Sequence, residues 1–468
     1  MEDKEYLLRE EVPQVALKKM IIPALIAGFI TMFNIITDTY FLGNYAADSL
    51  NSQAATSTSM SLFFLMSGLS FMLAVGTAVA TSQLLGAGYK QKVEQYMANS
   101  FVIGWLIYIV LLIILLPNLN NFVSLLTGEV STHPFYTNSY VYSLILVLGF
   151  PTVIFTQLSS QTIRAEGKSA LIAKLSFIQV VINCIINYFL ISDTIPAISF
   201  YGTQYEAAGA AIATIASQLF MCLVLMRILF NKEKTNYYIN LKNFKLEKNY
   251  FIVFKQGIPQ FINQVFIGLA VFITSYMAVY VSQKYGFTGD ASSLYPNASG
   301  IIIKLVLMIV TLSNGAAQGI QGFMAYQFGA NRFDRLNAGM KYINKFVFIF
   351  SISLFAIFFF GARFIPTIFT TNEQVINLLI MPIEITAIAC LFIPLGCVSF
   401  GLFASIDKVK YANIGSVIRD GILFCLLSLS LPLLIGPQGV MISSAIAMLL
   451  GSIIIIIMFN LTRRTLDK

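Results

Sequence analysis

Asp38 is the residue of this sequence best placed to do chemistry. It is the one charged residue in the long apolar stretch 20–42 and lies about 27 Å from its start if that stretch is helical. An unpaired carboxylate in hydrocarbon costs several kcal/mol, so Asp38 is expected to be protonated, bound to a cation or hydrogen-bonded. Asn34 precedes it by four residues and therefore shares its helix face. The pair predicts a proton- or cation-binding group.

Two further sets of polar side chains recur at helical spacing. Asn183 and Asn187 are four residues apart, and Asn314, Gln318 and Gln321 follow an i, i+4, i+7 pattern. Such a stripe normally faces a cavity or a neighbouring helix rather than lipid. Interhelical hydrogen bonding is the alternative role for these residues.

Other charged residues also occur inside apolar stretches. Glu384 is expected either to attract or couple a cation or to pair with Lys304, whose own alternative is to extend to the external interface. Arg419 and Asp420 are adjacent, and such balanced charge favours a local or interhelical ion pair.

The chain offers little for enzymatic chemistry. It has a single histidine, His133, and its five cysteines lie in apolar runs without CxxC spacing. No HExxH, GxSxG or Walker pattern occurs in a suitable context. We therefore expect no enzyme, no cofactor and no ATP-driven pump.

The elements that carry these residues are predicted from composition. Hydrophobic residues make up 57% of the 468 residues and charged residues only 11%, against about 25% in soluble domains. A membrane span needs about 20 apolar residues. Twelve stretches qualify, which predicts an all-α membrane protein: 20–42, 56–84, 100–118, 139–163, 170–191, 207–230, 256–281, 299–326, 346–369, 377–405, 412–435 and 439–461.

The basic residues predict the orientation of these spans. The loops 43–55, 119–138, 192–206 and 436–438 contain no Lys or Arg, whereas the alternate loops are rich in both. By the positive-inside rule, both termini are cytoplasmic in a cell (plasma or inner) membrane. The net charge of +8 then needs no nucleic acid to explain it.

An internal repeat divides the chain. Gly76, Gly86 and Pro151 match Gly319, Gly329 and Pro394 at one offset (329 − 86 = 243). Each half then has six spans and begins on the same side, which indicates a pseudo-two-fold axis along the membrane normal. We expect six-helix bundles at 1–230 and 251–468, joined by a basic cytoplasmic linker at 231–250.

The chain resembles the multidrug and toxic compound extrusion (MATE) transporters, of the bacterial drug-efflux branch. The resemblance rests on NIITDTYFLGN at 34–44, IRAEGKS at 163–169, NCIINYFLI at 183–191, GAAIATIASQ at 209–218 and AAQGIQGFMAYQFGANRFDRL at 316–336. It implies a secondary-active antiporter that exports amphipathic, cationic drug-like compounds in exchange for H⁺ or Na⁺ by alternating access. It also implies a monomer, and short cytoplasmic helices within 86–99 and 329–345.

The same resemblance implies an ion-coupling site. Asn183, Asn187 and Thr214 would join Asp38, and Asn34 lies beside it. Many relatives carry an aspartate where this chain has Asn187, so the site holds one formal charge. Amide and hydroxyl oxygens can still coordinate Na⁺, although the lost carboxylate favours H⁺.

The resemblance also suggests residues of a substrate cavity. Some relatives carry a glutamate in the seventh span, where this chain has amides and no acid. The candidate cavity residues are Ser160, Gln260, Asn263, Gln264, Asn314, Gln318, Gln321 and Glu384. A lipid-linked oligosaccharide flippase of the same superfamily is the alternative function, but the concentrated arginine lining that would favour it is missing from the sequence.

Overall fold

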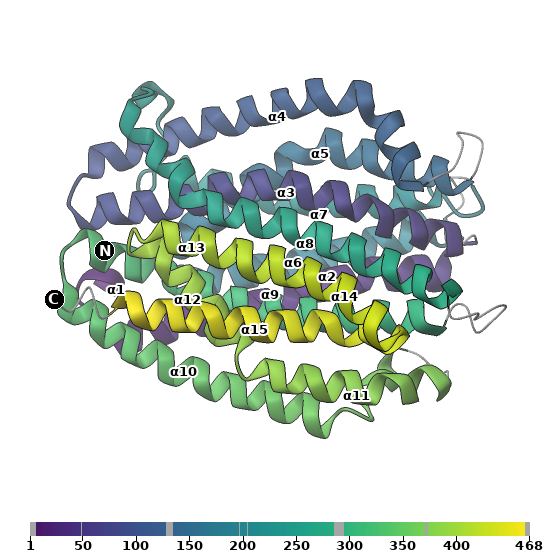
Figure 1. Ribbon diagram of the computed structural model, residues 1–468. Coiled ribbons are helices and arrows are strands. Elements are labelled where there is room, and N and C mark those ends of the chain that lie inside the picture. Colours follow the sequence, from purple (N-terminus) through teal and green to yellow (C-terminus); the bar gives the residue numbers. More distant parts are fainter. Residues whose placement is uncertain are drawn as a thin grey trace.

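The protein is a bundle of long helices that run along a common direction (Figure 1). The computed structural model describes residues 6–47, 49–127, 134–195, 197–203, 205–284, 294–369 and 373–463. The first part of the chain forms α1 (Tyr6–Arg9), α2 (Pro13–Tyr45), α3 (Ser49–Gly86), α4 (Lys90–Thr127), α5 (Pro134–Ala165), α6 (Ser169–Ile191) and α7 (Glu206–Leu229). The second part forms α8 (Phe251–Lys284), α9 (Leu294–Gly329), α10 (Phe333–Phe360), α11 (Glu373–Cys390), α12 (Ile393–Ser405), α13 (Val409–Ser416), the π-helix η5 (Val417–Leu423), α14 (Phe424–Ile435) and α15 (Pro437–Arg463).

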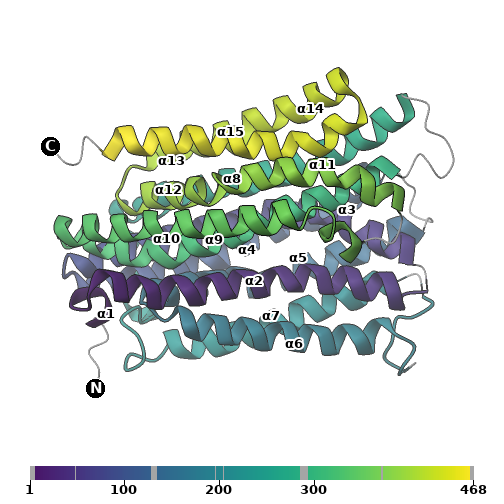
Figure 2. The same cartoon turned by 90° about the horizontal axis from the view of Figure 1, so that it is seen from below.

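The prediction of twelve membrane spans is confirmed: within the described ranges, twelve helical segments are long and apolar enough to cross a bilayer. Many large apolar side chains point outward, among them Ile113, Phe360 and Leu434. In water such a surface would aggregate, whereas lipid solvates it at no cost. Figures 1 and 2 place both chain termini at the same end of the bundle, called here the terminal end.

Two predicted spans are not single α-helices. The stretch 377–405 is broken after Cys390, and α12 restarts at Ile393 with Pro394 in its first turn. Proline fits the first turn of a helix, but it has no N–H to donate to the carbonyl four residues earlier, here that of Cys390, and its ring clashes with that carbonyl, which explains the break. The stretch 412–435 contains the π-helix η5, which adds a wide turn next to Arg419 and Asp420.

The short linking helices expected within 86–99 and 329–345 are absent from these described segments. Instead, only three residues separate the end of α3 at Gly86 from the start of α4 at Lys90. Likewise, three residues separate the end of α9 at Gly329 from the start of α10 at Phe333. The polar sequence at each turn therefore forms the first turns of the next long helix.

Helix α3 crosses the second part of the chain and packs on both α8 and α9. Near the terminal end the backbones of α3 and α9 touch. A Cβ atom on Gly86 would lie 2.1 Å from the Tyr326 carbonyl oxygen, and one on Gly329 would lie 2.0 Å from the Gln83 carbonyl oxygen. The two contacts are related by the repeat offset, because 86 + 243 = 329 and 83 + 243 = 326. This contact is isologous, as expected of a two-fold relation, and only glycine permits it.

The segment 231–250, which includes η1 (Leu241–Asn243) and η2 (Lys248–Tyr250), folds back on the first part of the chain. The buried Glu166 carboxylate accepts hydrogen bonds from the Asn236 backbone N–H at 2.7 Å and the Thr235 hydroxyl at 3.1 Å. Further along, the Asn99 side chain donates to the Lys245 carbonyl oxygen at 2.9 Å. The segment is thus held against α4 and the α5–α6 turn.

Candidate ion-coupling site

Asp38 lies where three helices of the first part meet. It comes from α2, Asn187 from α6 and Thr214 from α7. The Asn187 amide donates to one Asp38 carboxylate oxygen at 2.7 Å, and the Thr214 hydroxyl donates to the other at 3.1 Å. Asp38 is partly exposed, whereas Asn187 is fully buried and Thr214 is 8% exposed. A partly exposed carboxylate with two buried donors can exchange a proton or cation on its exposed side.

The two amides of α6 extend this network. Asn187 also donates to the Asn183 side-chain oxygen at 3.1 Å, and both residues are fully buried. Asn183 Nδ2 and Asn187 Oδ1 have no hydrogen-bond partner among the described residues. An unpaired buried polar atom costs about 1–3 kcal/mol, so the network is poised to take a further partner. The side chain of Asn34, on the same helix as Asp38, lies outside the described part of the structure.

Small residues and one buried acid position these helices. The first turns of α7 are rich in alanine and glycine, which allows close approach to its neighbours. Glu206, at the start of α7, is fully buried and accepts hydrogen bonds from the backbone N–H groups of Ala47 at 2.9 Å and Gly202 at 2.8 Å. This carboxylate fixes the end of α2 relative to α7. It was not predicted from the sequence, although an acid opening an apolar helix was a readable signal.

Tyr142 of α5 is a second residue near the site that was not predicted. It is 9% exposed and lies close enough to Asp38 for the carboxylate charge to act on its phenol. Nothing in the sequence pointed to it, because a tyrosine inside an apolar span is indistinguishable from a packing residue.

A second buried network occupies the other part of the protein. Arg419 and Asp420 form the expected ion pair, with Nε–Oδ1 at 2.7 Å and Nη2–Oδ2 at 3.0 Å, and each is 1% exposed. Asn263 of α8, expected in the substrate cavity, is instead buried and donates to Asp420 Oδ2 at 2.7 Å. In the first half, the acid Asp38 is on the first span and the amide Asn187 on the fifth. In the second half the order is reversed, with the amide Asn263 on the seventh span and the acid Asp420 on the eleventh.

The other candidate cavity residues occupy different environments. Gln260, Gln264 and Asn314 are partly exposed, and the Gln264 amide donates weakly to the Ser67 hydroxyl of α3 at 3.4 Å. Gln321 is 6% exposed, and the buried Ser160 hydroxyl has no partner in the part of the chain that the structure describes.

Gln318 of α9 accepts a hydrogen bond from Arg164 at the end of α5. Arg164 therefore connects the two parts of the chain. The polar stripe on α9 is consequently divided between a partly exposed end at Asn314 and a buried end at Gln321.

Glu384 and Lys304 do not meet. Both side chains are exposed, and no ion pair joins them in the described part of the structure. Glu384 shares its exposed face of α11 with Met381 and Ile388. The alternative in which Lys304 pairs with Glu384 is therefore wrong, because the two helices direct these residues to the outside rather than toward each other.

Comparison with known proteins agrees with this architecture. A family model described as MatE matches residues 23–189 and 296–428, more than half of the chain. The multidrug export protein MepA of Staphylococcus aureus strain MSSA476 is 24% identical over 455 residues, which cover 96% of this chain and 94% of that protein.

Solved structures show the same fold. A crystal structure of a MATE protein in complex with MaL6 superposes with a TM-score of 0.86 at 18% identity, covering 100% of this chain and 99% of that one. The outward-facing conformation of a multidrug resistance MATE family transporter of the MOP superfamily also gives a TM-score of 0.86, at 17% identity and 99% coverage of both chains. The resemblance inferred from the sequence motifs is confirmed, and the chain belongs to the MatE family of multi-pass membrane transporters.

Proposed function

We propose that this transporter is a secondary-active antiporter that exports amphipathic, cationic drug-like compounds in exchange for H⁺. The observation that carries the proposal is the partly exposed Asp38 carboxylate between buried amide and hydroxyl donors. Export of drugs is supported by the similarity to the multidrug export protein MepA over 96% of the chain. A monomer with both termini in the cytoplasm is the simplest form of this proposal.

Protonation of Asp38 rearranges its hydrogen bonds. In the ionised form both carboxylate oxygens accept, and the Asn187 amide donates to one of them. When that oxygen is protonated it becomes a donor and conflicts with the Asn187 N–H. A flip of the Asn187 amide removes the conflict, because Oδ1, unpartnered among the described residues, then accepts the new proton. The same flip withdraws the hydrogen bond from Asn183, so proton binding changes how α2 is joined to α6.

The donor arrangement favours H⁺ over Na⁺. A sodium ion at Asp38 needs several oxygen ligands directed at one point. Here the amide nitrogen of Asn187 and the hydroxyl of Thr214 direct hydrogens at the carboxylate. With only one formal charge, binding of Na⁺ must displace these donors and gains little Coulomb energy in return.

Alternating access follows from the division of the chain. Residues 1–230 and 251–468 would rock as two units about α3, α8 and α9, with 231–250 held on the first unit. The partly exposed amides Gln260, Gln264 and Asn314 would line the cleft and bind drugs together with apolar side chains. Asp38 would attract a cationic drug after losing its proton, so proton and drug compete for one charge.

The test uses purified protein in proteoliposomes with ethidium as the drug. An acidic lumen at matched Na⁺ should drive ethidium inward, and a Na⁺-loaded lumen at clamped pH should not. Asp38→Asn should abolish the pH-driven uptake. Asp407→Asn is the matched control, because Asp407 lies in an exposed turn and pairs loosely with Lys255 at 3.5 Å.

Two outcomes would overturn the proposal. Uptake driven by Na⁺ alone at clamped pH would exclude H⁺ as the coupling ion. Undiminished pH-driven uptake by Asp38→Asn would remove Asp38 from the coupling site.

A further inference from the structure

The residues just before α2 dock on the turn between α9 and α10. Three backbone carbonyls at and just after the end of α1 need partners from outside the helix, as at any helix C-terminus. The Leu8 carbonyl accepts from Gln327 Nε2 at 2.5 Å and the Arg9 carbonyl from Arg332 Nη1 at 2.7 Å. The Glu11 carbonyl accepts from Arg335 Nη2 at 2.6 Å. We call residues 6–12 the N-terminal strap.

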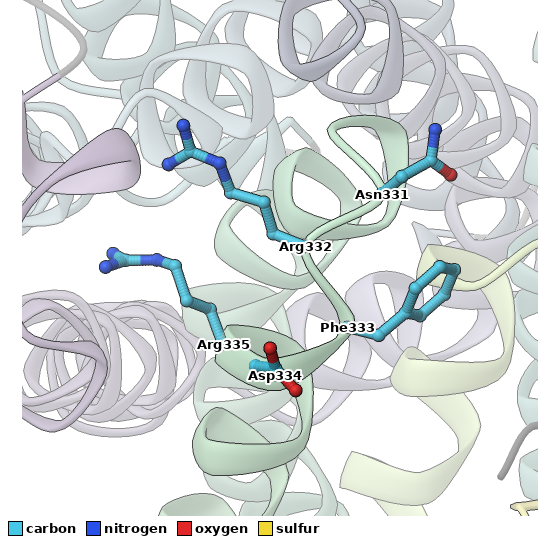
Figure 3. A pocket seen from close by; sticks show the side chains of 5 residues that line it. All are labelled: Asn331, Arg332, Phe333, Asp334 and Arg335. Carbon is cyan, nitrogen blue, oxygen red and sulfur yellow. The ribbon is translucent and has the colours of Figure 1, made fainter.

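Two arginines of the α9–α10 turn donate hydrogen bonds to the strap. Figure 3 shows Arg332 and Arg335 extending to the same side of the turn, whereas Phe333 points to the other. An open pocket of about 540 Å³ lies here, lined by residues 331–335. Guanidinium donors make stronger hydrogen bonds than neutral ones. Because all three acceptors are backbone carbonyls, the turn recognises the path of the strap rather than its polar side chains.

Apolar contacts attach the strap to both parts of the protein. Leu8 is fully buried and belongs to a core cluster that includes Leu336 and Met340 of α10. Leu7 packs on the α5–α6 turn, where a Cβ atom on Gly167 would lie 2.4 Å from Leu7 Cδ2. Gly167 has φ +91°, which favours glycine in any case. The strap therefore bridges the first and second parts of the chain.

The strap lies at the terminal end, where the backbones of α3 and α9 touch at Gly86 and Gly329. Opening this end separates these helices and carries the α9–α10 turn away from α5. Within the strap, α1 is joined to α2 by only three residues, 10–12, which span at most about 11 Å. The strap therefore cannot keep its contacts with both the α5–α6 turn and the α9–α10 turn while the terminal end opens.

We propose that the α9–α10 turn is a binding site for the chain's own N-terminal strap, and that its occupancy holds the terminal end closed. This inference rests on the proposed function in one respect, since alternating access requires that end to open. The strap acts as a latch that must leave Arg332, Arg335 and Gln327 before the cleft faces the terminal side.

The test measures the opening directly, without drug or ion gradient. Spin labels at Gln91→Cys on α4 and Ala338→Cys on α10, both exposed near the terminal end, report the distance between the two parts by double electron–electron resonance in nanodiscs. The five native cysteines are replaced by alanine in all samples. Arg332→Ala with Arg335→Ala should raise the ratio of the longer-distance to the shorter-distance population at least about tenfold. Lys345→Ala, an exposed basic residue of α10, is the matched control and should leave the distribution unchanged.

A second variant acts from the side of the strap. Leu8→Asp leaves α9 and α10 intact but places a charge in the buried cluster, so it should open the end as the arginine variant does. Unchanged distances in both variants would overturn the proposal, and so would opening in the arginine variant alone. Because the measurement needs no transport, a failure of proton coupling at Asp38 would not affect it.

Discussion

Replacing Asp420 tests how much the buried ion pair contributes to stability. Asp420→Asn removes the charge that balances Arg419, which is 1% exposed. The other contacts of the guanidinium are the Cys397 sulfur at 3.7 Å and the face of the Phe400 ring at 5.6 Å, and neither carries a formal charge. The new amide also directs an N–H at Arg419 or Asn263, both of which are donors. We expect a loss of about 3–5 kcal/mol, because an uncompensated buried charge is left behind.

The control is an ion pair of the same type at the surface. Asp407 and Lys255 are 3.5 Å apart with side chains 41% and 60% exposed, so Asp407→Asn should cost no more than about 1 kcal/mol. Asp407 has φ +55°, a conformation that asparagine also adopts well. The difference in stability loss between Asp420→Asn and Asp407→Asn therefore isolates the effect of burial.

The assay is thermal unfolding of the detergent-solubilised protein at one fixed heating rate. Asp420→Asn should lower the midpoint by far more than Asp407→Asn. The double variant Arg419→Met/Asp420→Leu removes both charges and should recover most of the loss, because a buried pair replaced by apolar residues is often nearly neutral. Equal shifts for the two single variants, or a double variant as unstable as Asp420→Asn, would refute the charge-balance reasoning.

Two further predictions concern the ion site and the strap. Asn187→Asp puts a second carboxylate where the Asn187 amide now lies 2.7 Å from Asp38. Two like charges so close require a cation or a shared proton. Ethidium uptake at clamped pH should therefore become dependent on Na⁺. Uptake that stays indifferent to Na⁺ would contradict this. The hydrogen bond from Lys19 holds the pKa of Glu11 below its ordinary value, so the pair contributes stability at neutral pH that is lost as the pH falls through that lowered pKa. The unfolding midpoints of the parent and Glu11→Gln should differ at pH 7 and converge in acid, whereas a difference that persists in acid would exclude this charge effect.

The sequence was informative about local features. Twelve spans were predicted from apolar runs, and the ion pair of Arg419 with Asp420 from their adjacency; both are found in the structure. The grouping of Asn183, Asn187 and Thr214 with Asp38 came from family motifs, and the structure brings these side chains together. The role of this group of residues in ion coupling stays a prediction.

Long-range contacts could not be predicted in the same way. Asn263 was expected in a cavity but bonds to Asp420, 157 residues away. No sequence pattern joined Arg164 to Gln318, 154 residues away, although the two are hydrogen-bonded. Pairing of Lys304 with Glu384 was one of the alternatives left open by the sequence, and no ion pair joins them in the described part of the structure. Whether two distant polar residues meet depends on the rotation and depth of each helix, which spacing within one helix does not specify.

Hydropathy and the 3.6-residue period are properties of short segments, so they specify the solvent, the number of spans and the face on which each polar residue lies. Which of these faces meet is a property of the folded protein. Three features depend on contacts between segments that are distant in sequence. They are the isologous helix contact at Gly86 and Gly329, the buried anchor Glu206 and the docking of the N-terminal strap. In a bilayer, where lipid solvates apolar side chains as well as a neighbouring helix does, such close packing and hydrogen bonding determine how the helices assemble.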